Sequence, residues 1–445
     1  MKTQSNIFFI ISLVSFCGFS QPARENTSNL PLNDSRVITR WHETLMDIIE
    51  QSPGFTPPVT ARSFAYINLA AYETAVQFDS NLRSLDGQIT DFKLRDELKL
   101  INPKQDYSAT MAVNQAIFSM IDKLYEPTFY TSMVKIYTLK DSLDTVFSKQ
   151  IQADVFERSK AFGESMATEI FEYSKTDGGH QAFIKSYDMA YKIPTCEGCH
   201  QINYAADLEN TGPMHPNWGT NRLFLAENKS LNIQPAIVFS KDKNSLFYAE
   251  AIKVYEGVKN TMRGSEKYKI ANYWDDGANA TFTPAGHSMS IVSNIVKQRK
   301  LSLSEGAEIF VKTALALNDA FIVCWKLKYK YNTIRPVTYI KRYIDKSFEP
   351  MLLTPPFPEF PSGHSTQAGA FATIMTKQFG DNYPFSDYSK FGYGEKRYYK
   401  SFNDAAKEVS NSRVYAGIHF EDACEQGLEL GKKVANNFEK LKFRK

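Results

Sequence analysis

The segment FPSGHSTQAG, residues 360–369, places a hydroxyl group, a glycine and a histidine directly before a stretch of helical character. We expect the N-terminus of this helix to lie at Ser362–Ser365. Free N–H groups at a helix N-terminus bind anions, and Gly363 lets the backbone approach a ligand closely. Ser362 adds a hydroxyl donor, and His364 can accept or release a proton near neutral pH. The segment therefore predicts an anion-binding site with an acid–base residue beside it.

Two cations precede this segment and are predicted to point at one place. A helix expected to begin near Ser304 carries an apolar stripe formed by Phe310, Ala314, Leu317, Phe321 and Cys324. Lys328 continues the stripe, so its ammonium group either snorkels at the helix end or faces a buried anion. Arg335 follows about two turns later on nearly the same face, and Pro336 is expected to end the helix.

A third segment, SRVYAGIHF, supplies another cation and another imidazole. It places Arg413 near the end of a helix that Gly417 is expected to terminate, and His419 just beyond. Alone, each segment is weak evidence, because an isolated Lys–Arg pair usually lies on a solvated face and an isolated histidine is more often structural. Together the three segments supply three cations, a hydroxyl, an open amide and two histidines. This set of groups is suited to binding a tetrahedral oxyanion.

The elements that must position these residues are predicted to be helices. Helical spacing is clear in the stripe Val113, Ile117, Met120 and Leu124. A further helix is expected over Arg62–Phe78, after a break at Pro57 and Pro58, whereas residues 175–222 and 263–287 are expected to be long loops. The 445 residues, 43% of them apolar, can fill a sizeable core. Without an internal repeat or a linker, a single all-α domain is favoured.

The N-terminal residues are typical of a secretory signal. Residues 1–20 contain Lys2, an apolar run over Ile7–Phe16 and small residues before a cleavage site. Cys17 could instead carry a lipid anchor, but the bulky Phe16 before it fits that poorly. We expect cleavage to leave a mature domain of residues 21–445 in the periplasm or outside the cell.

Charge and hydropathy limit the partners. The net charge of +3 gives no positive field of the kind that nucleic-acid binding requires. No stretch after the signal approaches the about eighteen apolar residues of a membrane span, so no stable membrane insertion is expected. No apolar stripe demands a dimer, and the oligomeric state stays open.

The pentapeptide CEGCH, Cys196–His200, matches the attachment pattern of c-type haem. It lies in a loop-rich region without an evident small cytochrome domain. A disulfide or thiol staple is therefore preferred over haem, and zinc is disfavoured because a fourth ligand is not apparent. His215 and His287 could approach the anion site from loops, but hydrogen bonding in the core or in loops is favoured for both.

The three segments resemble a signature shared by vanadium-dependent haloperoxidases and the type 2 phosphatidic acid phosphatase superfamily. Order and spacing agree in Lys328-x6-Arg335-Pro336, Pro361-Ser362-Gly363-His364 and Ser412-Arg413-x5-His419. The resemblance extends over about residues 41–435 and implies an all-α bundle whose signature core spans 304–440. The long helical region ahead of the signature is similar to the bacterial haloperoxidases, whereas soluble acid phosphatases are usually much shorter.

The resemblance also implies a role for each residue of the signature. Lys328, Arg335 and Arg413 would neutralise the oxygens of vanadate or phosphate. The Ser362 hydroxyl and the Gly363 amide would add hydrogen-bond donors.

The two histidines of the signature would take different roles. His419 would bind vanadium, or would attack phosphorus in a phosphatase. His364 would be the general acid–base. On this resemblance, the catalytic residues are His364, His419 and Lys328.

Trp325 and Phe357 resemble the aromatic pair beside the vanadate of chloride-oxidising and some bacterial iodide-oxidising enzymes. An apolar rim lowers the local dielectric and can remove water from an approaching halide, although the two rings could equally be core packing. Two positions depart from the family pattern. Lys326 stands where many members have an acidic residue, which leaves the halide preference open. Ala423 stands where an aspartate is common.

Asp422 lies one position before Ala423. It is expected to form a helix capping box with Glu425, or alternatively to orient His419. Gly427 and Gly431, further along the same helix, are expected to allow close packing.

The resemblance thus implies an exported vanadate-dependent haloperoxidase. Its substrates would be hydrogen peroxide and a halide, iodide or bromide, and the hypohalous acid produced would halogenate small organic acceptors. The alternative is an exported acid phosphatase that uses the same residues with His419 as nucleophile. Phosphate and vanadate have the same charge and a similar shape, so the anion-binding residues do not discriminate between them.

Overall fold

The computed structural model describes residues 34–99, 101–102, 104–126, 128–202, 212–278, 280–389 and 395–445. Over these ranges the chain forms thirteen α-helices and one two-stranded antiparallel hairpin, which confirms the all-α prediction. The expected secretory signal, residues 1–20, lies outside them. The helices are α1 (Arg36–Ile49), α2 (Pro57–Val76), α3 (Ala109–Leu124), α4 (Tyr130–Gln150), α5 (Ala153–Lys175), α6 (Leu246–Lys259), α7 (Glu266–Tyr273), α8 (Thr283–Arg299), α9 (Leu303–Tyr331), α10 (Pro336–Tyr343), α11 (Gly363–Phe379), α12 (Phe402–Tyr415) and α13 (Glu421–Asn437). The strands are β1 (Phe385–Tyr388) and β2 (Lys396–Tyr399).

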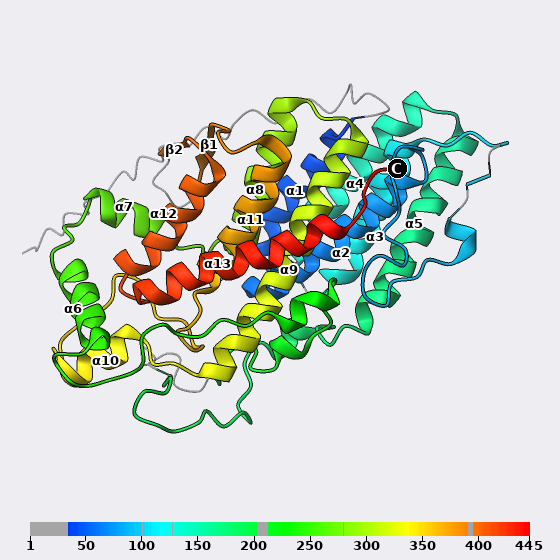
Figure 1. Ribbon diagram of the computed structural model, residues 1–445. Helices are drawn as coiled ribbons and strands as arrows, with labels where there is room; N and C mark the ends of the chain where they lie inside the picture. The colour runs from blue at the N-terminus through cyan, green and yellow to red at the C-terminus, as the bar shows by residue number, and fades with distance from the viewer. Residues whose placement is uncertain are drawn as a thin grey trace, which may run out of the picture.

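The long helix α9 joins two groups of helices. Its first part packs against α2, α8 and α1, and α2 in turn packs against α3 and α5. Its later part packs against α11 and α13, with α12 on the other side of α11. Figure 1 shows α9 between the blue-to-cyan helices of the N-terminal half and the orange-to-red helices of the C-terminal half. One large cluster of buried apolar side chains runs through both groups.

The N-terminus of α9 differs from the prediction by two residues. Ser302, not Ser304, is the N-cap, and its side chain accepts from the Glu305 N–H while the Glu305 carboxylate accepts from the Ser302 N–H. This reciprocal pair is a capping box and contributes about 1 kcal/mol to helix stability. The periodicity alone could not separate the two serines, since both precede the same apolar stripe.

The C-terminus of α9 corrects a second prediction. The helix ends at Tyr331, and Asn332 caps it in a left-handed conformation with φ of 49°. Arg335 is therefore outside α9: it is the N-cap of α10, and Pro336 begins that helix rather than ending the previous one. Lys328 and Arg335 still face one loop, because the chain turns between the two helices.

Other expectations are met in part. The stripe on Val113 lies in α3 as predicted. Pro57 and Pro58 form the first turn of α2 instead of breaking the chain before it, because proline fits the first helical positions. The expected loop at 175–222 contains only short 3-10 turns among its described residues, but the one at 263–287 contains α7 and the start of α8.

Glycines allow α13 to cross α11 at close range, as predicted. A Cβ atom added at Gly431 would lie 1.9 Å from the Thr366 carbonyl oxygen, and one at Gly427 would lie 2.9 Å from the Ser362 carbonyl oxygen. The Ser362 N–H donates to the Ala423 carbonyl across 3.0 Å. This crossing therefore fixes the N-terminus of α11 against the start of α13.

The expected capping box of α13 is wrong. Phe420 is the N-cap and makes no side-chain cap, and the Asp422 carboxylate accepts instead from the Ala236 N–H at 3.0 Å. The Asp422 carboxylate therefore binds the backbone at Ala236 and does not cap its own helix.

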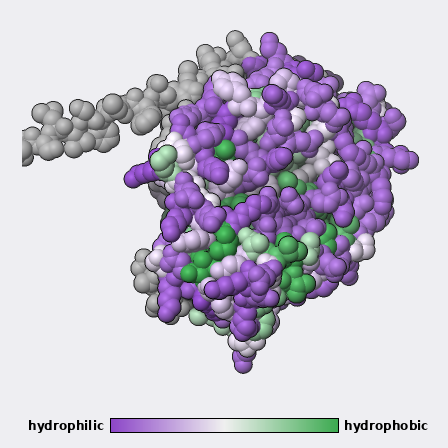
Figure 2. Space-filling view, turned by 60° about the vertical axis from the view of Figure 1, so that its left-hand side comes forward, coloured by the Kyte–Doolittle hydropathy of each residue, from purple (hydrophilic) through white to green (hydrophobic). Residues whose placement is uncertain are grey.

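The surface is polar over most of the face shown in Figure 2, where a short band of apolar residues crosses it. None of the helices within the described ranges combines the length and the apolar character needed to cross a membrane.

Candidate active site

His419 lies in the loop between α12 and α13 and is buried. Arg335 Nη1 lies 3.0 Å from His419 Nε2, and because a guanidinium can only donate, Nε2 must present a lone pair. The proton of the neutral ring is then on Nδ1, which donates to Glu359 Oε1 across 2.8 Å. Burial, followed by the charge of Arg335, holds the pKa of His419 well below its usual value. His419 is therefore a neutral imidazole with a defined tautomer, and its Nε2 lone pair faces Arg335 Nη1.

Glu359 is the positioning residue that the sequence did not reveal. Its Oε1 accepts from both His419 Nδ1 and the Phe420 N–H, the latter at 3.0 Å, and its side chain is fully buried. Asp422, which was considered for this role, is bound to Ala236 instead. The only signal in the sequence is an acidic residue inside an apolar, proline-rich stretch, PPFPEFPSGH, where burial of a carboxylate requires a partner.

We expect replacement of Glu359 to weaken oxyanion binding. Glu359→Gln keeps an oxygen acceptor for Nδ1 but removes the charge, so about a tenfold loss of vanadate affinity is expected; Glu359→Ala should lose about 100-fold, the upper range for such partners. Equilibrium dialysis with vanadate measures both. Glu308→Gln is the matched control. Glu308 is a buried carboxylate on α9, about 30 Å from Lys328 along the helix, and it is paired with Lys312 and Arg444. Unchanged affinity in Glu359→Ala would contradict the positioning role.

Lys328 and Arg335 enclose the loop at residues 357–359. Lys328 Nζ donates to the carbonyl groups of Pro358 at 2.9 Å and Glu359 at 3.0 Å. Arg335 Nε donates to the Phe357 carbonyl at 3.1 Å, while its Nη2 is buried and has no hydrogen-bond partner among the residues that the structure describes. The sequence prediction that the two cations meet is thus confirmed, although they belong to different helices.

The three predicted cations are all buried inside the protein. Lys328, Arg335 and Arg413 are at most 1% exposed, and among the described residues none of them forms an ion pair. Burial lowers the pKa of Lys328 to about 7 and that of Arg335 to about 10, and the nearby Glu359 carboxylate opposes both shifts without cancelling them. Buried charge of one sign is costly, so the arrangement indicates an anionic ligand.

Arg413 and His364 share a backbone acceptor. Arg413 Nη1 lies 3.5 Å from the Asp275 carbonyl oxygen, and Nη2 donates to the Trp274 carbonyl. His364 Nε2 lies 3.2 Å from the same Asp275 oxygen. Because a carbonyl only accepts, Nε2 carries the proton, and in the neutral ring Nδ1 is left as the base.

His364 is also the one predicted anion-site group that keeps intermediate exposure. Burial, followed by the charge of Arg413, holds its pKa well below the usual value, so the ring is neutral near pH 7. These properties suit a general base.

Ser362 and Gly363 occupy the positions predicted for them. Ser362 is the N-cap of α11, and Gly363 is its first residue, so the Gly363 N–H is among those that have no partner inside the helix. The Ser362 hydroxyl accepts from the Ser365 N–H at 3.3 Å and the Ser365 hydroxyl at 3.0 Å. The Ser362 hydroxyl therefore lies in a buried network with Ser365 at the start of α11.

The aromatic pair lies beside the cations. The rings of Trp325 and Phe357 have centroids 5.0 Å apart. Lys328 Nζ is 4.9 Å and Arg335 Cζ 5.0 Å from the Phe357 centroid, so both charges lie close to this ring. A Cβ atom added at Gly363 would meet Trp325 at 3.4 Å, which places the start of α11 on this apolar wall.

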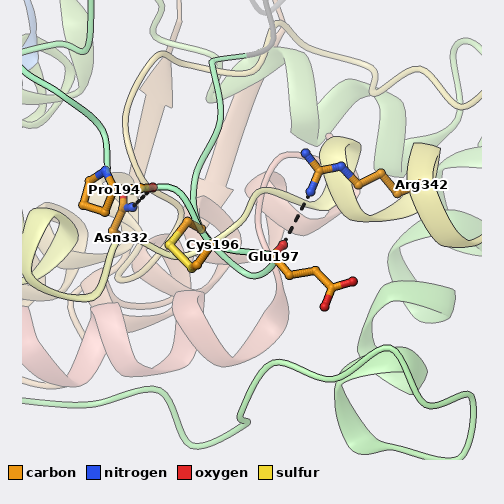
Figure 3. Close-up of a disulfide and its surroundings, with 6 residues drawn as sticks. Pro194, Cys196, Glu197, Asn332 and Arg342 are labelled. Carbon is orange, nitrogen blue, oxygen red and sulfur yellow. Dashed lines mark hydrogen bonds between the residues drawn. A yellow bond between two sulfur atoms is a disulfide. The ribbon is translucent and has the colours of Figure 1, made fainter.

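The CEGCH segment forms a disulfide, Cys196–Cys199, and lies beside Asn332 (Figure 3). The bonded sulfurs have no thiol left for a haem thioether, so the haem interpretation is wrong and the disulfide is confirmed. The Ile334 N–H donates to the Gly198 carbonyl and the His200 N–H to the Asn332 carbonyl. The segment therefore holds the stretch that connects Lys328 to Arg335.

The stretch between Lys328 and Arg335 also contacts Glu359, the hydrogen-bond partner of His419. The Glu359 N–H donates to the Thr333 carbonyl at 3.1 Å, and the Phe360 N–H donates to the Thr333 hydroxyl at 2.8 Å. His200 itself is buried, and both its ring nitrogens lack a hydrogen-bond partner. Burial, followed by the Arg335 charge, lowers its pKa to about 3.

We expect the double variant Cys196→Ser, Cys199→Ser to weaken phosphate binding several-fold, because Thr333 then holds Glu359 less firmly. The stability cost should be about 2 kcal/mol at most, since the disulfide closes a loop of only four residues. Calorimetric titration with phosphate and thermal unfolding measure the two effects. Reductant should reproduce the loss in the native protein and change nothing in the variant. Equal phosphate affinity in all samples would contradict this role.

His215 and His287, the two histidines considered for an approach from loops, make hydrogen bonds to other groups, as the sequence favoured. His215 Nε2 is 2.7 Å from the Thr56 hydroxyl. His287 lies on α8 between the carboxylates of Asp276 and Asp387, behind the residues that contact His364.

Comparison with known proteins agrees with this geometry. A solved bacterial vanadium-dependent iodoperoxidase is 30% identical to this chain, with a TM-score of 0.83 over 94% of this chain and 98% of that one. The chain belongs to the vanadium-dependent haloperoxidases. Its haloperoxidase fold also matches a holo-type bacterial vanadium-dependent chloroperoxidase, with 14% identity and a TM-score of 0.67 over 94% of this chain and 95% of that one.

Two sequence comparisons give the same haloperoxidase family. Residues 308–443 match the family described as VCPO second helical-bundle domain, and this range contains every residue of the predicted signature. The vanadium chloroperoxidase of Curvularia inaequalis is 25% identical over 191 residues, which is 36% of this chain and 31% of that protein. The chain thus spans about a third of the length of this curated relative.

Proposed function

We propose that this protein is a vanadate-dependent haloperoxidase that oxidises iodide or bromide with hydrogen peroxide to hypohalous acid. The observation that carries the proposal is the set of three buried cations, none of which forms an ion pair within the described residues, around a histidine whose Nε2 presents a lone pair. The unpartnered Arg335 Nη2 is a donor with nothing to bind within the described part of the protein. A tetrahedral oxyanion such as vanadate fits this donor set.

The residues that would hold vanadate are those that offer hydrogen-bond donors or a lone pair at the site. Lys328, Arg335 and Arg413 would bind its oxygens, and the Ser362 hydroxyl and Gly363 N–H would add donors. His419 would be the ligand to the metal through Nε2. When bound, vanadate supplies a Lewis-acidic centre that activates peroxide for oxygen transfer to a halide.

The protein groups then act on protons and water. His364 Nδ1 would take a proton from hydrogen peroxide, and later return one to the departing hydroxide, while its Nε2–H stays on the Asp275 carbonyl. Trp325 and Phe357 would exclude water from the path of the halide. The iodoperoxidase named among the relatives supports iodide as a substrate of this chain as well.

An exported location belongs to the same proposal. Residues 1–20 resemble a secretory signal, and the Cys196–Cys199 disulfide is the kind of bond that persists in an oxidising compartment. Hypohalous acid released there would halogenate small organic acceptors.

The deciding experiment uses the chain without residues 1–20, freed of bound metal in phosphate-free buffer. Peroxide-dependent oxidation of iodide, bromide and chloride is measured with and without vanadate, alongside hydrolysis of p-nitrophenyl phosphate by the vanadate-free protein. Vanadate-dependent halide oxidation that phosphate suppresses would support the proposal. Hydrolysis of the phosphate ester without halide oxidation would show that the site serves an acid phosphatase with His419 as nucleophile.

The pH dependence of turnover should show an unusually acidic limb. The base needs His364 to be neutral, and since its pKa is held well below the usual value of about 6.5, the ring stays neutral as the pH falls through that value. Activity is therefore expected to persist as the pH falls below 6.5 and to be lost only when His364 protonates. A kcat profile at saturating peroxide and halide measures this, and a half-maximal acid limb at pH 6.5 or above would contradict it.

A further inference from the structure

His287, on α8, is enclosed by two carboxylates. Its Nδ1 lies 3.0 and 2.9 Å from the two oxygens of Asp276, and its Nε2 lies 2.7 Å from Asp387 Oδ2. The ring and both carboxylates are at most 3% exposed. Because ionised carboxylates only accept hydrogen bonds, both ring nitrogens must donate, and the side chain is an imidazolium.

The remaining faces of this ring are also fixed. Trp274 stacks on it with ring centroids 4.4 Å apart, and Phe282 contacts it edge-on at 5.2 Å. The Tyr273 hydroxyl donates to the same Asp387 oxygen at 2.7 Å. His287 therefore connects three elements, α8, the hairpin strand β1 and the turn after α7, through contacts that allow one orientation.

The turn after α7, residues 274–277, has an uncommon backbone conformation at the residue that His287 binds. Asp276 has a φ of 45°, in the left-handed region that non-glycine residues rarely adopt. Such a conformation costs free energy and persists where other contacts hold it. The bidentate contact of Asp276 with the imidazolium is the contact that can do so.

The two carbonyl groups just before Asp276 orient the proposed active-site residues. The Trp274 carbonyl accepts from Arg413 Nη2, and the Asp275 carbonyl accepts from Arg413 Nη1 and from His364 Nε2. The direction of these carbonyls depends on the backbone angles of the turn. Asp276, which His287 binds, is thus the residue next to Asp275, whose carbonyl sets the tautomer of His364.

We propose that His287 is a positioning residue for the active site: by binding Asp276 it holds the carbonyls of residues 274 and 275, which fix Arg413 and keep His364 in the Nε2–H tautomer. The inference rests on the proposed function for its catalytic consequence, although the tautomer itself is a property of the free protein. Without the contact, the turn can relax, Nδ1 carries the proton in part of the population, and the base is lost from that fraction.

His287→Gln tests this proposal, with His42→Gln as the matched control. His42 is equally buried, stacks on Phe64 and Phe310, and bonds Asn68 far from the anion site. Three quantities are compared in the full mature chain: the His364 tautomer from ¹⁵N NMR of histidine-labelled protein, phosphate affinity by calorimetry, and kcat of the vanadate-loaded enzyme.

We expect His287→Gln to give mixed His364 tautomers, a several-fold weaker affinity for phosphate and a kcat about 10- to 100-fold lower, as for a misplaced catalytic group. His42→Gln should lower only the melting temperature. The proposal is overturned if His287→Gln, like the control, lowers only the melting temperature and leaves the His364 signals and kcat unchanged. If it does not fold, Asp276→Asn, which removes one of the two oxygens, should shift the same signals in the same direction, and unchanged signals would overturn the proposal.

The test separates this inference from the proposed function. A wild-type protein that shows the Nε2–H tautomer but oxidises no halide would contradict the function and leave the tautomer comparison intact. A wild-type enzyme that is active, with an equally active His287→Gln variant, would contradict only the positioning role.

Discussion

His364→Ala is expected to lower the rate of halide oxidation by about 10²- to 10⁴-fold while the protein retains most of its vanadate affinity. The reason is that His364 is proposed as a base and not as a ligand: its Nε2 binds the Asp275 carbonyl, which leaves Nδ1 as the basic nitrogen of the neutral ring. Oxyanion binding rests on other side chains. Steady-state kinetics at saturating peroxide, together with equilibrium dialysis of vanadate, separate the two effects.

His215→Ala is a suitable control for His364→Ala. His215 is buried and hydrogen-bonded to Thr56, and the pKa of its ring is lowered to about 4 by burial, so it resembles His364 without a place in the anion site. Full activity of His364→Ala would refute the acid–base role. A parallel loss of vanadate from that variant would instead make His364 a binding residue.

His419→Ala should abolish stable retention of vanadate, with a loss of affinity of about 100-fold or more. The substitution removes the proposed metal ligand and also takes one hydrogen-bond partner from Arg335 Nη1 and one from Glu359 Oε1, in a buried place where lost hydrogen bonds are costly. Metal analysis after gel filtration measures the retained vanadium. A full complement of vanadium in the variant would show that His419 is not the ligand.

The two histidine variants differ in their response to added vanadate. Excess vanadate should restore part of the activity of His419→Ala if the cations still gather the anion, but none of the activity of His364→Ala. A phosphate titration of each variant provides the reference, because phosphate binding needs Lys328, Arg335 and Arg413 but no metal ligand.

The sequence was most informative where local pattern decides structure. Ser362, Gly363 and His364 occupy the helix N-terminus that a hydroxyl, a glycine and the following apolar residues predict. Gly417, with a φ of 78°, directly follows the C-cap of α12, where a glycine was expected to terminate the helix. At both helix ends the conformation is decided by residues that are close in the sequence, so the local pattern could predict it.

The sequence was least informative where distant segments compete for one group. Glu359 was not predicted, because its partner His419 is 60 residues away and no periodic pattern links them. Arg335 was placed on the wrong helix, since the left-handed turn at Asn332 depends on the tertiary fold, including the disulfide segment that pairs with it. Asp422 was assigned to its own helix, yet Ala236 binds it.

The three buried cations have a consequence for the folding equilibrium of the protein. Any tetrahedral oxyanion that binds only the native state raises the free energy of unfolding, by about 2.7 kcal/mol when its concentration is 100 times its dissociation constant. Phosphate in the surrounding medium would then act as a reversible stabiliser of the chain before the metal arrives. The same ion that competes with vanadate for the site would thus protect the empty enzyme from unfolding.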